Sequence, residues 1–282
     1  MNYVDVFYTS DDGLRLYARD YPGSSAAVPV ILCLPGLTRN SKDFAALADE
    51  LCKDCRLVCP DQRGRGRSAR DPDPAHYRPE RYVGDMETLL KLLNVRQFVV
   101  IGTSLGGLMA MMMMARDPQR IHAAVLNDIG PELDPRGIAR IAAYVGKAAP
   151  VASWQDAARQ VEAINGAAFP DFREDDWLAM ARDTYIQEGA VPVLDYDPAI
   201  SQGIAAGNAA PNLWPLFEMV STRPLLVLRG ESSDILSART LAEMVRRLPN
   251  VSAVSIPRRG HAPTLAEPAA RTAIAAFLSG KA

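Results

Sequence analysis

The sequence predicts an α/β protein with a mostly parallel, doubly wound sheet and an inserted helical lid. Short β-branched runs alternate with helix-like stretches along most of the chain, as expected where helices connect parallel strands that are buried on both faces. Apolar and polar residues alternate near the N-terminus, which predicts a hairpin. The stretch between Asn127 and Pro224 is far longer than the roughly thirty residues of one strand-helix-strand crossover, so it holds an insertion.

The elements follow in order along the chain. Apolar and polar residues alternate on both sides of Asp11-Asp12-Gly13, a turn sequence that predicts a β-hairpin. Buried strands are expected in the runs VPVILCLPG, CRLVCPDQRG, QFVVIGTS, IHAAVLND, PLLVLRG and VSAVSIPRRG. Helices are expected over Lys42 to Asp54, Pro79 to Leu93, Leu105 to Arg116, Thr240 to Leu248 and Pro268 to Leu278.

The predicted insertion divides the core in two. Residues 1–130 and 219–282 form the core, and residues 131–218 form a lid. Amphipathic helices are expected around 137–145, 154–164 and 175–186. Large aromatic side chains commonly line apolar small-molecule pockets, so we expect Trp154, Trp177 and Trp214 to contact a compact, largely apolar part of the substrate. The alternative is that these tryptophans only hold the lid helices together.

The charge balance bears on the possible partners. There are 31 Lys and Arg against 33 Asp and Glu, which gives no sign of a nucleic-acid surface. The N-terminus lacks the pattern of an export signal, and the longest apolar run, Leu105 to Ala115, is too short to span a bilayer. We therefore expect a cytoplasmic protein that binds a small-molecule substrate and neither nucleic acid nor membrane, with its oligomeric state left open.

The four cysteines offer two interpretations. Cys52 and Cys55 form a CxxC pair that could hold a metal or cycle between thiol and disulfide. Cys33 and Cys59, however, lie in apolar strand runs, and no second CxxC or paired histidines complete a zinc set. We favour buried free thiols, and we expect neither a metal nor an organic cofactor.

The stretch VVIGTSLGGLMA contains a candidate nucleophile. A strand-like run changes into a helix-like run across Gly102 to Gly107, and Ser104 stands at the apex of the turn. A turn this sharp needs glycine where a Cβ would collide with the backbone, here at Gly102 and Gly106. This is the GxSxG nucleophile elbow, which requires a histidine base and an acid elsewhere in the chain.

Only three histidines can supply the base. His76 lies in a polar loop and His122 precedes a strand, whereas His261 follows a strand and a glycine, at the sheet edge where open α/β folds place their ligands. Two acids follow neighbouring strands, Asp128 and Asp234. We favour Asp234, because nucleophile, acid and histidine then follow in the order Ser, Asp, His.

These motifs resemble those of the α/β-hydrolase superfamily. The segments GTSLGG, RGESSD and RRGHAPTLAEP are similar to its nucleophile, acid and histidine motifs, and LPGLTRN and DQRGRGRSA are similar to its oxyanion loop and to its loop after the fourth strand. The resemblance implies that the backbone N–H groups of Leu37 and Leu105 bind the oxyanion. Many members have His-Gly in the oxyanion loop where this chain has Pro35-Gly36. Backbone donors do not depend on side-chain identity, so this difference concerns how the loop is held and not the donors themselves.

The predicted function is a serine hydrolase that cleaves a small carboxylic ester or lactone through an acyl-enzyme intermediate. A carbon–carbon hydrolase of ring-cleavage products and a hydrolase-fold receptor with slow turnover are the alternatives. Arg39, two residues past Leu37, is a candidate for contacting substrate. Arg63, Arg65 and Arg67 could bind a carboxylate, but we favour a structural loop with ion-paired or solvated guanidinium groups.

Overall fold

An eight-stranded sheet forms the centre of the computed structural model, which describes residues 2–25, 28–205, 212–220 and 222–280. The strand order is β1-β2-β4-β3-β5-β6-β9-β10, and β2 alone runs in the direction opposite to the other seven strands. The strands are β1 (Val4–Thr9), β2 (Arg15–Tyr21), β3 (Val30–Leu34), β4 (Arg56–Asp61), β5 (Phe98–Thr103), β6 (Ile121–Asn127), β9 (Leu225–Gly230) and β10 (Val251–Ile256). The predicted hairpin and the six predicted buried strands are therefore confirmed.

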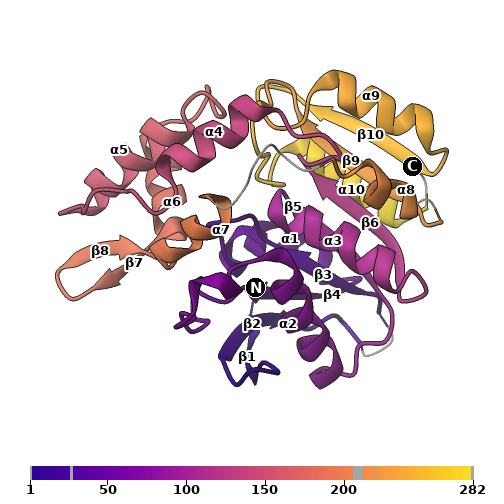
Figure 1. The fold of residues 1–282 in the computed structure, drawn as a ribbon, viewed down its shortest axis with the longest axis horizontal. Coiled ribbons are helices and arrows are strands. Elements are labelled where there is room, and N and C mark those ends of the chain that lie inside the picture. Colours follow the sequence, from indigo (N-terminus) through magenta and orange to yellow (C-terminus); the bar gives the residue numbers. More distant parts are fainter. Residues whose placement is uncertain (1, 26–27, 206–211, 221, 281–282) are drawn as a thin grey trace.

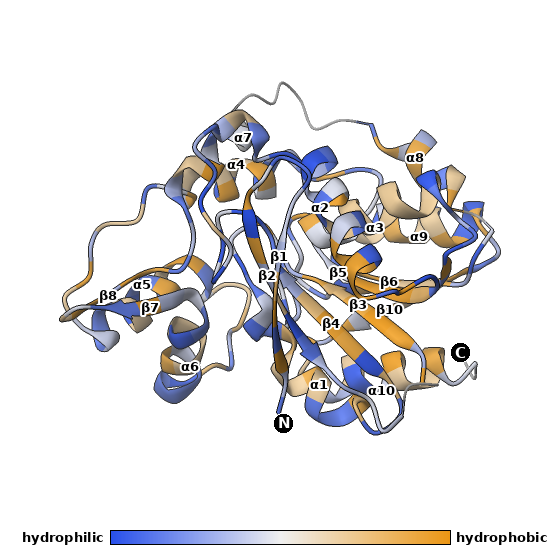
Figure 2. Ribbon diagram, turned by 90° about the horizontal axis from the view of Figure 1, so that it is seen from below, coloured by the Kyte–Doolittle hydropathy of each residue, from blue (hydrophilic) through white to orange (hydrophobic). Residues whose placement is uncertain are grey.

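Helices cover both faces of this sheet. Figure 2 shows α1 and α10 on one face and α2, α3, α8 and α9 on the other. The helices are α1 (Ala45–Leu51), α2 (Pro79–Leu92), α3 (Leu105–Arg116), α8 (Trp214–Met219), α9 (Ala238–Arg247) and α10 (Pro268–Leu278). The central strands are largely apolar (Figure 2), and their buried side chains belong to two cores, one on each side of the sheet. The predicted doubly wound sheet is confirmed.

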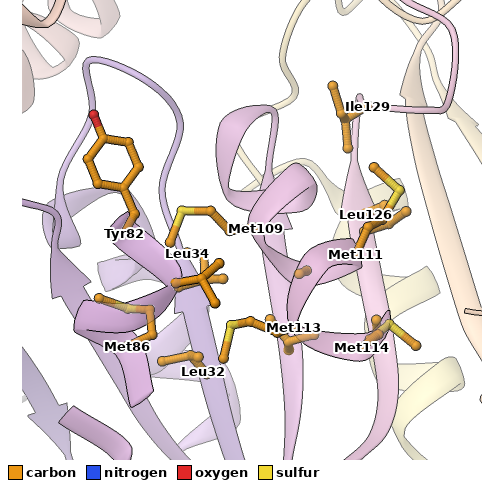
Figure 3. Close-up of a cluster of buried hydrophobic side chains, with 14 of the residues drawn as sticks. Leu32, Leu34, Tyr82, Met86, Met109, Met111, Met113, Met114, Leu126 and Ile129 are labelled. Atoms are coloured by element: carbon orange, nitrogen blue, oxygen red, sulfur yellow. The ribbon is translucent and has the colours of Figure 1, made fainter. Parts of the chain in front are cut away.

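Helix α3, which carries the nucleophile at its start, is buried among methionines. Met109, Met111, Met113 and Met114 are almost fully buried, and Figure 3 shows them among side chains of β3, α2 and β6. Flexible thioether side chains fill irregular gaps between helix and sheet. The run of methionines thus fixes α3 against the sheet.

The chain between β6 and β9 leaves the sheet and returns to it. It forms α4 (Pro135–Tyr144), α5 (Trp154–Asn165), α6 (Glu174–Thr184), the strands β7 (Tyr185–Glu188) and β8 (Val191–Leu194), and α7 (Ser201–Ala205). Figure 1 shows these elements together to one side of the sheet. We call residues 131–205 the insert, because they hold all of these elements.

The insert differs from the predicted lid in two ways. The third predicted helix ends at Thr184, and the chain continues as an antiparallel hairpin, β7 and β8, that turns at Gly189 with φ +57°. The lid was also predicted to extend to residue 218, but Phe217 of α8 is fully buried in the core on the α3 side of the sheet. Helix α8 therefore packs with the core, and residues 206–211 lie outside the described residues.

The four cysteines are free and buried, as the sequence indicates. All four belong to the core between the sheet and helices α1 and α10: Cys33, Cys52, Cys55 and Cys59. Among the described residues, no helix combines the length and the apolar character needed to cross a membrane.

Candidate active site

The turn between β5 and α3 holds Ser104 in a left-handed conformation, with φ +52°. The backbone can be this tight because of its glycines. A Cβ on Gly102 would lie 2.3 Å from the carbonyl oxygen of Gly106, and one on Gly106 would lie 2.0 Å from that of Leu34. Both distances are steric collisions, so the elbow requires glycine at both positions, as predicted.

His261 reaches Ser104 from the loop after β10. Its Nε2 lies 2.9 Å from Oγ of Ser104, within the reach that a general base needs. The amide of Asn127 donates a 2.8 Å hydrogen bond to the carbonyl of Pro263 and so ties the histidine loop to the end of β6. The other two histidines are elsewhere, since His76 contacts Asp71 and His122 has an exposed side chain.

Asp128 is the carboxylate that faces the histidine. Its Oδ2 lies 2.7 Å from Nδ1 of His261. Gly230 N–H donates to Oδ1 at 2.7 Å, and the Ser233 hydroxyl donates to Oδ2 at 2.6 Å. The Asp128 side chain is completely buried, so these bonds compensate for the loss of water around its charge. With φ +56°, Asp128 turns away from the strand direction just as β6 ends.

The prediction that Asp234 contacts His261 is wrong. Asp234 accepts two hydrogen bonds from Arg140 of α4, 2.6 Å from Nε and 2.9 Å from a terminal nitrogen. These bonds lower the pKa of Asp234. The physical reason is strand order: β6 lies directly beside β5, whereas β9 lies one strand farther from Ser104. Asp128, at the end of β6, therefore takes the place beside the histidine.

The two amides predicted to bind an oxyanion lie on adjacent loops. Leu34 of β3 pairs with Gly102 of β5, so the loop after β3 lies beside the nucleophile elbow. A Cβ on Gly36 would lie 3.8 Å from Cβ of Ser104. Neither Leu37 N–H nor Leu105 N–H donates a backbone hydrogen bond among the described residues. Both amides therefore stay available to a ligand.

A cavity of about 330 Å³ opens beside Ser104 and His261, between the sheet and the insert. This volume lies at the lower end of the range for small-molecule sites. One group of lining side chains is apolar and comes from the insert: Ile141, Val161, Ile164, Phe169, Phe172 and Leu194. A second group is polar and includes Arg39, Asp43, Asp183 and Thr184.

None of the three predicted pocket tryptophans lines this cavity. Trp177 is buried within the insert against the rings of Phe169 and Phe172. Trp154 donates its indole N–H to Gln187 of β7 at 2.9 Å. Trp214 lies in α8, where the guanidinium of Arg247 covers its ring at 3.9 Å. The alternative interpretation, packing between lid helices, describes Trp154 and Trp177, whereas Trp214 packs with α8 against the core.

Arg39 does line the cavity, but another carboxylate already binds it. Its guanidinium donates to both oxygens of Asp43, with distances from 2.6 to 3.0 Å, and also donates to Thr184 of the insert. Asp183 also lines the cavity, and burial raises the pKa of its carboxyl. The polar end of the cavity therefore presents donors and acceptors together.

Two of the three arginines after β4, Arg63 and Arg67, are ion-paired, as favoured from the sequence. Arg63 is fully buried and pairs with Asp12, Asp71 and Asp85. Arg67 is half exposed and pairs with Asp5 at 2.6 Å. None of the arginines Arg63, Arg65 and Arg67 lines the cavity.

The insert is attached to the loop that carries the histidine. Gly260 N–H donates to the carbonyl of Ala168 at 2.8 Å, and Arg259 forms an ion pair with Asp171. A Cβ on Gly260 would lie 2.8 Å from Cα of Ala168, so the two backbones are in close contact. The residues next to Ala168 include Phe169, which lines the cavity. The same contacts therefore hold both the cavity wall at Phe169 and the loop of His261 in place.

The family model for the alpha/beta hydrolase fold matches residues 29–268. The chain belongs to the α/β-hydrolase family. The serine, histidine and aspartate described above stand at the edge of a hydrolase sheet, and the protein is a hydrolase, in agreement with its named relatives.

Of three similar proteins, two have a named activity and the third is a solved structure of an alpha/beta hydrolase. The 3-hydroxybutyrate-oligomer hydrolase of Cupriavidus necator is 37% identical over 96% of this chain and 95% of its own length. The 2-(acetamidomethylene)succinate hydrolase of Mesorhizobium japonicum is 28% identical over 83% of this chain and 81% of its own. The crystal structure of an alpha/beta hydrolase from Novosphingobium aromaticivorans is 46% identical, with a TM-score of 0.93 and 98% of each chain covered.

Proposed function

We propose that this hydrolase is a serine esterase that cleaves esters of short hydroxy acids, such as small oligomers of a 3-hydroxy acid, through an acyl-enzyme. The observation that carries the proposal is the hydrogen-bonded chain Ser104, His261, Asp128, which opens onto a cavity of about 330 Å³. A nucleophile, a base and an orienting carboxylate in this arrangement are what acyl transfer requires.

Each residue has a role in the proposed reaction. Ser104 Oγ attacks the ester carbonyl, and His261 takes the hydroxyl proton and returns it to the departing alcohol. Asp128 keeps the Nδ1 proton of His261 in place and stabilises the imidazolium. The N–H groups of Leu37 and Leu105 bind the oxyanion. Water then attacks the acyl-enzyme by the same route and releases the acid.

The cavity and one relative support the substrate class. The apolar side chains from the insert suit the short carbon chain of a hydroxy acid, and the polar end around Arg39 and Asp183 suits its hydroxyl group. The similarity to a 3-hydroxybutyrate-oligomer hydrolase over nearly the whole length of both chains favours an ester bond between hydroxy acids over a carbon–carbon bond.

The test is turnover on matched esters. Purified protein is incubated with the dimer and trimer of 3-hydroxybutyrate, with the methyl ester of the dimer, and with a butyrate ester that lacks the hydroxyl. Released acid is measured by chromatography, with Ser104→Ala as the control for background hydrolysis. Preferential cleavage of the hydroxy-acid esters is expected. No turnover at micromolar enzyme on any of them would contradict the proposal and favour a receptor.

A further inference from the structure

The loop that carries Leu37 N–H has three consecutive carbonyls that are each fixed by a hydrogen bond. The carbonyl of Pro35 accepts from the side chain of Gln62 at 3.1 Å. The carbonyl of Gly36 accepts from Arg39 N–H at 3.1 Å. The carbonyl of Leu37 accepts from Nε of Arg65 at 2.8 Å.

These bonds set the direction of the central amide. In a planar trans peptide, the carbonyl and the N–H point to opposite sides. The peptide that joins Gly36 to Leu37 has its carbonyl bound to Arg39 N–H, so its N–H is directed the other way. Fixing the peptides on both sides prevents this central unit from rotating.

Arg65, which binds the Leu37 carbonyl, is a buried cation without an ion-paired carboxylate in the part of the chain that the structure describes. It is completely buried, and it forms no ion pair with a carboxylate among the described residues, although Arg63 two residues away forms three. One of its terminal nitrogens donates to the carbonyl of Arg63 and to the hydroxyl of Tyr82. The guanidinium also lies over the rings of Tyr77 and Tyr82.

Burying a cation without a carboxylate is costly, so its hydrogen bonds and its aromatic contacts must compensate. Of these hydrogen bonds, the one to the Leu37 carbonyl links Arg65 to the loop beside Ser104. A lysine could keep the charge, but it lacks the planar group that donates from Nε while its terminal nitrogen donates elsewhere.

We propose that Arg65 is a positioning residue for the oxyanion hole. It holds the Leu37 carbonyl, and thereby keeps the Leu37 N–H aimed at the oxygen that becomes negative in the transition state. The inference rests on the proposed function in that Ser104 is the nucleophile and Leu37 N–H binds the oxyanion.

The test uses a probe that needs no knowledge of the natural substrate. A fluorophosphonate reacts with an activated serine: the Ser104 Oγ–P bond forms, the P–F bond breaks, fluoride leaves, and the hydroxyl proton passes to His261. The phosphonyl oxygen takes the place of the ester oxyanion. Labelling rates are measured for wild type, Arg65→Lys, Arg65→Met and the control Arg67→Met, which alters a half-exposed arginine of the same loop.

Loss of one oxyanion donor typically lowers rates by 10² to 10³, and a misaimed donor should lose part of this. We expect labelling to fall about 10-fold in Arg65→Lys and about 100-fold in Arg65→Met, with Arg67→Met within about 2-fold of wild type. On an ester, kcat should fall by the same factors while KM changes by less than about 3-fold. A merely structural role would lower thermal stability and leave the folded enzyme's kcat unchanged.

The result that overturns the inference is a correctly folded Arg65→Lys that labels at the wild-type rate. Measurements at 10 °C, with the folded fraction checked by circular dichroism, keep unfolding from imitating the effect. If wild type labels rapidly but cleaves no hydroxy-acid ester, the substrate proposal fails, whereas the labelling rates of the variants still decide the role of Arg65.

Discussion

The hydroxyl of Ser233 lies 2.6 Å from Oδ2 of Asp128, the same oxygen that lies 2.7 Å from Nδ1 of His261. Ser233 Oγ also accepts N–H groups from Ile235 and Leu236 at 3.1 Å each. The loop after β9 was predicted to supply the acid, Asp234. It supplies instead Ser233, which binds the carboxylate of Asp128. This arrangement leads to two predictions about the carboxylates and their support.

Asp128→Asn should lower kcat by about 10⁴, because an amide at this place stabilises the wrong histidine tautomer. Asp234→Asn should change kcat by less than about 10-fold, because Asp234 contacts Arg140 rather than His261. Both values come from steady-state assays on an activated ester. A larger loss in Asp234→Asn than in Asp128→Asn would reject the assignment of Asp128.

Ser233→Ala should lower kcat about 10-fold. The change removes a hydrogen bond to a buried charge, and such bonds contribute about 1.5 to 3 kcal/mol. Ser232→Ala is the matched control, since the neighbouring hydroxyl is exposed and donates to the carbonyl of Arg259 instead. The two variants are compared by kcat and by urea unfolding. Equal kcat values for both would show that Ser233 has no part in orienting Asp128.

Phe172→Ala should change which esters the enzyme prefers, because Phe172 lines the cavity. Trp214→Ala should leave the preference unchanged, because Trp214 packs in α8 beneath Arg247. The measurement is kcat/KM for acyl chains of increasing length. The expected pattern is a gain for longer chains relative to short ones in Phe172→Ala alone, and the same ranking in both variants would place the specificity elsewhere.

The cysteines should be inert in the native protein. Burial raises the pKa of Cys52 to about 11 and also raises the pKa of Cys55, so the thiolate that reacts forms only at higher pH. At pH 8, a thiol-specific disulfide reagent should react slowly with folded protein and promptly with four thiols in urea. Rapid reaction of two thiols in the folded protein would restore the redox interpretation of the CxxC pair.

The sequence predicted the sheet and the loops that reach its edge, because buried strands and the glycines of the elbow leave local signals. The chain order of nucleophile, acid and histidine was used to favour Asp234, but Asp128 satisfies the same order, so this order cannot decide between the two aspartates. The choice depends on which strand lies next to β5, and that is a property of the assembled sheet.

The prediction that the three tryptophans line the cavity is wrong for a related reason. Composition places aromatic residues in the insert, but the direction of a side chain depends on how the helix packs. The hairpin of β7 and β8 did leave a signal, Gly189 between runs of strand-forming residues. That signal was hidden by the helical pattern that precedes it.

The hydrogen bond from Gly260 to Ala168 limits how new activities can arise on this scaffold. Single replacements at cavity side chains such as Phe172 reshape the pocket and leave the backbone of the insert, and therefore the histidine, in place. A graft that exchanges the whole insert must also reproduce the carbonyl of Ala168 and the carboxylate of Asp171 that bind the histidine loop. In this protein, the insert is not an interchangeable module, and point substitution is the more accessible route for engineering and for evolution.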